Sequence, residues 1–155
     1  MKRIILLIAI CLPMMVMAQN KVAVYVTSSS ENVADNVKKI VGCELVAAIV
    51  NTKQYKAVER TSDFLSQISK EQDYQRSGKV DDDQISAIGK QFGVNYVCVA
   101  SIMPYNNIYY IQARIIDVET ATVMSFARIT TPLVNLDDII TTVKQLSDQL
   151  IGNIN

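Results

Sequence analysis

Residues 95–103, NYVCVASIM, are almost entirely apolar or small. A strand that is covered on both faces has this pattern, whereas a strand with one wet face alternates apolar and polar residues. We therefore predict a central strand here, with other elements packed on both of its faces. Pro104, the next residue, is expected to end it.

Downstream of this strand, residues 108–118 and 123–130 alternate and are separated by Glu119–Thr122. This pattern predicts an antiparallel hairpin. Asn135 then offers a cap for a closing helix. The apolar stripe of that helix has three- and four-residue spacing and consists of Leu136, Ile139, Ile140, Val143, Leu146, Leu150 and Ile151.

Upstream, KVAVYVT (residues 21–27) predicts a buried first strand, and YKAVE (residues 55–59) a second. Between them we expect a helix that ends near Asn51, with N-caps available from Ser28–Ser30. Its apolar stripe comprises Val33, Val37, Ile40, Val41, Leu45, Ala48 and Ile49.

Two shorter helices are expected before the central strand. Thr61 or Ser62 can cap a helix that runs to about Gln72, and a polar surface loop follows over residues 73–82. Asp81 and Gln84 have the spacing of a capping box for the next helix, which places Ile85, Ile88 and Phe92 inward and ends at Gly93. The prediction is an α/β (α+β sandwich-like) fold with a mixed sheet of about five strands, in the order β-α-β-α-α-β-β-β-α.

The first 18 residues have the pattern of a cleavable export signal. Lys2 and Arg3 precede a short apolar run that ends at Pro13, and Val16 and Ala18 are the small residues that a signal peptidase prefers. A membrane-spanning helix needs roughly 20 apolar residues. We expect cleavage after Ala18, leaving residues 19–155 as one periplasmic or secreted domain.

Lipidation and nucleic-acid binding are not expected. Ile10 is bulky where a lipobox before Cys11 would have a small residue. The chain has 15 basic and 15 acidic residues, so loss of Lys2 and Arg3 leaves a slightly acidic protein whose cations are scattered. Such a surface lacks the basic patch that phosphate binding requires.

Cys43 and Cys98 remain after cleavage, in a compartment where disulfides form. Both lie in apolar segments. We expect two buried thiols that act as small hydrophobic residues, while a bridge between them stays an open alternative.

The chain contains no histidine, which removes the usual base for a Ser or Cys nucleophile and the commonest zinc ligand. Its five glycines never cluster into a phosphate loop. Asp81–Asp83 are expected to complement a helix start and lack the spacing of a calcium loop. We predict no cofactor, no metal site and no enzyme activity.

Glu44 is a candidate perturbed carboxylate. It falls among the apolar residues of its helix, where burial would raise its pKa unless a cation paired with it. The sequence places no second carboxylate beside it. An ion-paired glutamate at the edge of the core is the alternative.

The candidate partner-binding residues are an aromatic and amide-rich cluster at the turn before the hairpin, together with two residues of the polar loop. The cluster contains Tyr105, Asn106, Asn107, Tyr109 and Tyr110, and the loop contributes Tyr74 and Arg76. Tyrosines combine a large contact area with a polar tip, which suits a protein interface or a sugar surface. Strand propensity alone would also explain them.

Several segments, in this order, resemble the curli-assembly CsgG family and the related LpoB-type activators of penicillin-binding proteins. They are Val58–Arg60, Ile68 to Glu71–Gln72, Gly78, Ile88–Lys90, Gly93–Val97 and Ala113–Val118. The resemblance implies an envelope protein without catalytic residues. Gly89 and Gly93 suit close packing and a tight turn, while Arg60 closes the second strand. Ser101 and Ala121 depart from the family, which often has glycine there.

Some members of the family that this chain resembles are secretion pores. This chain has no additional amphipathic hairpins that could form transmembrane strands. We expect a periplasmic adaptor or accessory factor of assembly or cell-wall synthesis that binds another envelope protein and could form a homo-oligomer. The alternative is a domain that binds a small ligand or glycan through its tyrosines.

Overall fold

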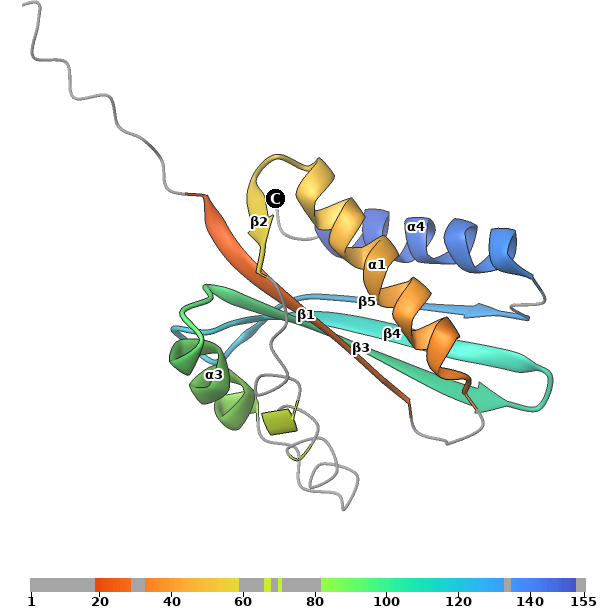
Figure 1. The fold of residues 1–155 in the computed structure, drawn as a ribbon, viewed down its shortest axis with the longest axis horizontal. Helices are drawn as coiled ribbons and strands as arrows, with labels where there is room; N and C mark the ends of the chain where they lie inside the picture. The colour runs from red at the N-terminus through yellow and green to blue at the C-terminus, as the bar shows by residue number, and fades with distance from the viewer. Residues whose placement is uncertain are drawn as a thin grey trace, which may run out of the picture.

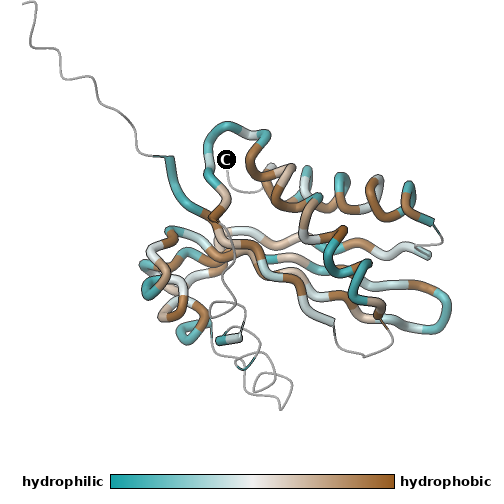
Figure 2. The backbone as a smooth tube through the Cα atoms, in the orientation of Figure 1, coloured by the Kyte–Doolittle hydropathy of each residue, from teal (hydrophilic) through white to brown (hydrophobic). Residues whose placement is uncertain are grey.

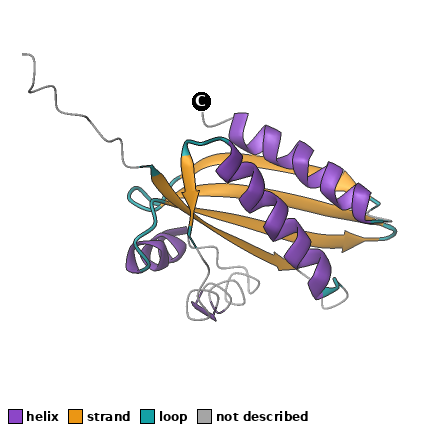
Figure 3. Cartoon of the chain, turned by 45° about the horizontal axis from the view of Figure 1, so that its top comes forward, coloured by secondary structure: helices purple, strands orange, loops and turns teal. Residues whose placement is uncertain are grey.

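The computed structural model describes residues 19–28, 33–58, 66–67, 70, 82–132 and 135–152. Within these residues the chain forms a five-stranded mixed sheet in the order β2-β1-β3-β4-β5, with helices on both faces (Figures 1 and 3). The predicted fold class is confirmed. The helix expected to end at Gln72, the loop after it and the cap Asp81 lie mostly outside the described residues.

The sheet combines a parallel half and an antiparallel half. Its strands are β1 (Asn20–Ser28), β2 (Tyr55–Ala57), β3 (Tyr96–Tyr105), β4 (Ile108–Asp117) and β5 (Val123–Thr131). β1 runs parallel to β2 and β3, whereas β3, β4 and β5 are antiparallel neighbours. Parallel strands need a long crossover, which helix α1 (Asp35–Asn51) provides between β1 and β2, while short turns suffice for antiparallel strands.

β3 is the buried centre that its sequence predicts. Cys98, Ala100 and Ile102 belong to the core beneath α1 and α4 (Leu136–Gly152), and Val97 and Val99 belong to a second core with α3 (Asp82–Gln91). The hydropathy colouring of Figure 2 shows hydrophobic segments concentrated in the central strands and along α1 and α4.

The prediction that Pro104 ends the strand is wrong. β3 continues to Tyr105, and Pro104 pairs with Tyr109 of β4. The described part of β1 ends opposite Ile102, so Pro104 lies beyond that neighbour. A strand without a neighbour on one side tolerates proline because no partner there needs its missing N–H.

The start of α1 also differs from the prediction. Ser28 is the last residue of β1, while Ser29 and Ser30 lie outside the described residues. Ala34 precedes the helix without a side-chain cap. The predicted apolar stripe of α1 is confirmed in the middle and at the end of the helix, where Val41, Leu45 and Ile49 are buried.

α4 begins as predicted. The Asn135 side chain accepts the Asp138 N–H at 2.9 Å, and the Asp138 carboxylate accepts the Asn135 N–H at 3.2 Å. This reciprocal pair satisfies two helix-start donors. Leu136 and Ile140, however, were expected to face inward and are exposed, because α4 turns its buried side toward β5 and β4 through Ile139, Val143, Leu146 and Leu150.

At the β4–β5 turn, Ala121 occupies a backbone conformation that glycine would favour. Ala121 adopts a left-handed φ of 57°, the region that glycine occupies most readily. The Asp117 side chain accepts the N–H groups of Glu119 and Thr120, both at 2.8 Å, and holds the turn in place.

Cys43 and Cys98, the two cysteines in the described part of the chain, are free and differ in burial. Cys98 is buried in β3, as expected. Cys43 is exposed, contrary to the prediction, because it points away from the side of α1 that packs on the sheet.

Candidate partner-binding surface

The β3–β4 turn gathers most of the predicted cluster at one end of the sheet (Figure 1). Asn106 and Asn107 form the two-residue turn, and Asn106 has a left-handed φ of 54°. Asparagine tolerates this conformation better than most residues, which explains its place in a tight hairpin.

Strand alternation then sorts the aromatic residues onto two faces. Tyr105 pairs with Ile108, and Met103 pairs with Tyr110, so these four side chains share the face of the sheet that also carries α3. Tyr109 points the other way and packs against the core beneath α1 and α4. The structure therefore removes Tyr109 from the cluster.

The outermost pair is the most exposed part of this surface. Tyr105 is 69% exposed and Ile108 is 41% exposed, while Met103 and Tyr110 are half-buried behind them. We call these four residues, with Asn106 and Asn107, the hairpin-tip patch. Met103 and Ile108 were not among the predicted residues, although the alternation on either side of the turn indicates that they share a face with Tyr105.

The other candidates lie elsewhere. Tyr74 and Arg76 are outside the described residues. Glu44 is half-buried and lines a groove of about 570 Å³ between α1 and α4, on the side remote from the sheet. Asp148 and Lys144 of α4 line the same groove and pair with each other at 3.3 Å.

This groove contains a second carboxylate that sequence analysis did not place beside Glu44. The remaining lining is mainly small or apolar and consists of Ala47, Ala48, Asn51, Thr52, Ile140, Ile151 and Gly152. The i,i+4 spacing of Lys144 and Asp148 predicts their ion pair, but only the packing of α4 beside α1 brings them near Glu44. In the described part of the chain, no group of three Cys, Asp or Glu side chains could hold a metal ion.

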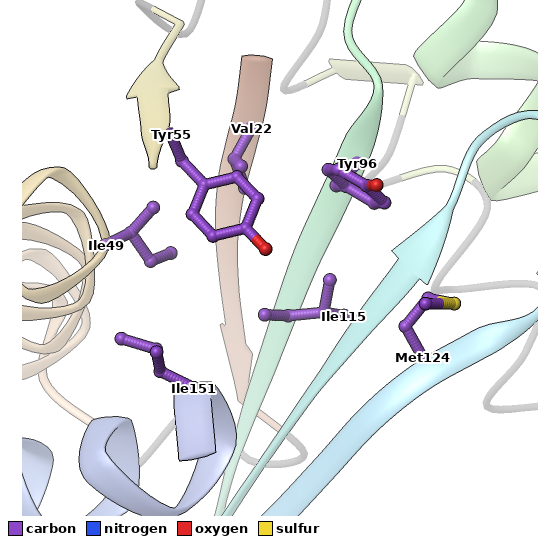
Figure 4. Close-up of a pocket in the computed structure, with 7 residues that line it drawn as sticks. All are labelled: Val22, Ile49, Tyr55, Tyr96, Ile115, Met124 and Ile151. Atoms are coloured by element: carbon purple, nitrogen blue, oxygen red, sulfur yellow. The ribbon is translucent and has the colours of Figure 1, made fainter. Parts of the chain in front are cut away.

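A small apolar cavity lies where the sheet meets the ends of α1 and α4. Figure 4 shows its lining, which consists of Val22, Ile49, Tyr55, Tyr96, Ile115, Met124 and Ile151. The rings of Tyr55 and Tyr96 meet edge to face, with centroids 5.8 Å apart. Burial, followed by the neighbouring Tyr96, raises the pKa of Tyr55. At about 10 Å³ the cavity is a packing gap, too small for an organic ligand.

The hairpin-tip patch offers exposed apolar contact area, and its six residues include no acidic, basic or thiol side chain. The model of the family "Curli production assembly/transport component CsgG" matches residues 15–110, which run from a few residues before β1 to the start of β4. The chain belongs to the CsgG family. The resemblance that the sequence motifs suggested is thus confirmed for the greater part of the chain.

Solved structures share the fold of this CsgG-family chain. TolB from Acinetobacter baumannii is 10% identical, with a TM-score of 0.56 over 89% of this chain, which spans only 29% of that protein. A PelC dodecamer from Paraburkholderia phytofirmans is 10% identical, with a TM-score of 0.53, over 86% of this chain and 88% of PelC. The LpoB C-terminal domain from Salmonella enterica is 15% identical, with a TM-score of 0.48, over 74% of this chain and 83% of that domain.

No curated protein sequence matches the chain. At these identities the TolB and PelC structures establish the fold alone. Among the described residues, no helix has the length and apolar content needed to cross a membrane.

Proposed function

We propose that this CsgG-family chain is a non-enzymatic, exported envelope protein that binds another envelope protein through the hairpin-tip patch. The single observation that carries the proposal is the exposed Tyr105–Ile108 pair at the end of the β3–β4 hairpin. Exposed aromatic and aliphatic side chains next to amides form the kind of centre that protein interfaces use.

The sequence supports a role in recognition. A chain without histidine lacks the commonest general base near neutral pH, and family membership associates it with assembly and transport components. The leader pattern of residues 1–18 supports export and removal of that segment. Intact-mass measurement of the exported protein tests this part of the proposal, because cleavage after Ala18 leaves Gln19 as the first residue.

The geometry favours a protein partner over a glycan. Tyr109 lies on the opposite face of β4 from Tyr110, so only two of the three tyrosines, Tyr105 and Tyr110, share the exposed face. The patch instead combines Tyr105, Ile108 and Met103, which together suit contact with apolar side chains of another protein.

Site-specific photo-crosslinking in intact cells tests the docking surface. We expect benzoylphenylalanine at position 105 to give an adduct with one envelope protein, whereas the same residue at position 50 gives none. Val50 is a matched control because it is an exposed apolar residue, 43% exposed, on α1. The substitutions Tyr105→Ser and Ile108→Ser should then abolish capture of that protein, and Val50→Ser should not.

Identical adducts from positions 105 and 50, or none from either, would contradict the proposed surface. Thermal unfolding in the presence of soluble cell-wall glycans distinguishes the alternative. A ligand that binds only the folded state raises Tm. A Tm increase that Tyr105→Ser removes would replace the protein partner with a glycan.

A further inference from the structure

β5 is a long strand at the edge of the sheet. It spans nine residues, Val123–Thr131, and among the described residues it has a neighbour on one side only, β4. The opposite edge strand, β2, has only three residues. The outer edge of β5 therefore presents a row of backbone donors and acceptors that can pair with another strand.

The side chains of β5 do little to prevent such pairing. Val123, Met124 and Phe126 are 44%, 43% and 46% exposed. Arg128 is the only charged residue in the strand, and the strand has no proline. Protected edges usually carry lysines, prolines, bulges or short strands. The irregularity of β5 lies at Met124, near its start, which leaves Ser125–Thr131 as a regular edge.

The sequence of β5 is complementary to itself when two copies run antiparallel. A two-fold axis perpendicular to the sheet keeps each face of one copy beside the same face of the other. Side chains alternate between faces along a strand, so two residues that lie directly opposite each other must both be odd-numbered or both be even-numbered. One residue then lies on the axis. The pairing of β5 with β4 shifts by one residue at Met124, because Ile115 pairs with Ser125 and Ile116 with Val123, so the regular part of β5 is Ser125–Thr131. Placing Ala127 on the axis aligns the regular residues Ser125–Ile129.

This register also keeps the Arg128 side chains of the two copies from lying opposite each other. Phe126 of one copy faces Arg128 of the other, and the pair occurs twice, which permits a cation–π contact on each side of the axis. Moving the axis to Arg128 would instead place two guanidinium groups opposite each other. Like charges directly opposite destabilise a strand pair.

We propose that two copies of this chain join edge to edge through β5, with Ala127 on the two-fold axis, to form one sheet continuous across both copies. α4 lies over β5 and is tied to it by the Ser125 hydroxyl, which donates to the Leu150 carbonyl. The two α4 helices then cover the same face of the joined sheet. Tyr110 of the hairpin-tip patch pairs with Thr130 of β5, but the patch lies on β3 and β4, one strand away from the outer edge of β5.

The test measures the mass in solution of the exported protein, purified from cells that express the full chain, by sedimentation across micromolar concentrations. Wild type should sediment as a dimer. Phe126→Arg places arginine opposite Arg128 twice and should weaken dimerisation by about tenfold or more. Adding Arg128→Glu to that variant converts both pairs to opposite charges and should restore the dimer.

Val50→Arg controls for the introduced charge, since Val50 is similarly exposed on α1 and should leave the dimer intact. Far-UV circular dichroism confirms that each variant is folded. A monomeric wild type, as expected if the edge instead accepts a strand of another protein, would overturn the proposal. A dimer that Phe126→Arg leaves unchanged, or that Arg128→Glu does not restore, would overturn the interface and its register.

Discussion

Cys98 and Cys43 are chemically identical residues that their surroundings make different. Cys98 is buried in the centre of β3, and this burial raises the pKa of its thiol to about 12. Cys43 is exposed on α1. Because the thiolate is the nucleophile in alkylation, exposure and ionisation together decide which thiol reacts.

We predict that iodoacetamide at pH 8 alkylates Cys43 in the native exported protein and leaves Cys98 unmodified, whereas both react in denaturant. Mass spectrometry of the alkylated peptides measures this, and Cys43→Ser should make the native protein inert. Alkylation of Cys98 at the rate of Cys43 would show that β3 is not buried as described.

The raised pKa of the Cys98 thiol also affects the stability of the protein in alkaline solution. Below about pH 9, the ordinary pKa given for the thiol, Cys98 is protonated in both the folded and unfolded states. Above it only the unfolded state loses the proton, so the contribution of Cys98 to the free energy of unfolding falls as pH rises from 9 toward 12. Cys98→Ala should make the decline less steep.

At the scale of elements, α3 depends on a close approach to the sheet. Gly89 lies against the end of β4, where a Cβ atom would come within 2.5 Å of a Val118 methyl and 3.1 Å of a Val97 methyl. The buried Ser86 hydroxyl, one turn earlier, donates to the Val118 carbonyl. These two small residues let α3 pack directly on the strands.

We predict that Gly89→Ala destabilises the protein. Overpacking costs about 1–3 kcal/mol, against about 1 kcal/mol gained from the better helix propensity of alanine. Urea unfolding measures the difference. Gly152→Ala is the matched control, because nothing lies within 4 Å of the Cβ position at the end of α4.

A double variant separates steric overlap from other causes. Val118→Ala removes the methyl groups nearest to position 89, so Gly89→Ala should cost less in that background than in wild type. Equal costs in the two backgrounds would contradict the packing explanation.

At the scale of the whole molecule, two hydrophobic cores share one sheet. The larger core lies between the sheet and the helices α1 and α4, and the smaller one lies beneath α3. Adjacent residues of β3, such as Cys98 and Val99, belong to different cores. Because both cores use the same strands, unfolding the strands beneath one core exposes the other core as well.

We predict a single cooperative unfolding transition. Thermal unfolding followed by far-UV circular dichroism and by tyrosine fluorescence should give the same midpoint, since a two-state protein loses secondary and tertiary structure together. Separate midpoints would show that α3 and its core unfold independently of the rest.

Much of the fold could be predicted because local patterns report burial directly. The near-continuous apolar run of β3, the alternation of β4 and β5 and the Asn135 cap each correspond to an element in the structure. The errors at Pro104 and at the start of α1 concern where elements end. Ends depend on neighbouring strands and on loop geometry, which lie beyond the local pattern.

The candidate site was predicted only in part. The turn at Asn106 and Asn107 was expected, yet the separation of Tyr109 from Tyr110 follows from which face of β4 packs beneath the helices. Similarly, the helical spacing of Glu44 suggested a lone carboxylate, and only the packing of α4 beside α1 placed Asp148 in the same groove.

The sequence by itself determined the apolar periodicity, the absence of histidine, the export leader pattern and the motif order of the CsgG family, because these properties belong to neighbouring residues or to composition. The meeting of Tyr105 and Ile108 as an exposed pair, and the long edge that β5 leaves unpaired among the described strands, follow from contacts made on folding. Such features depend on strand order and on which face is covered, and both arise from contacts between residues that are distant in the chain.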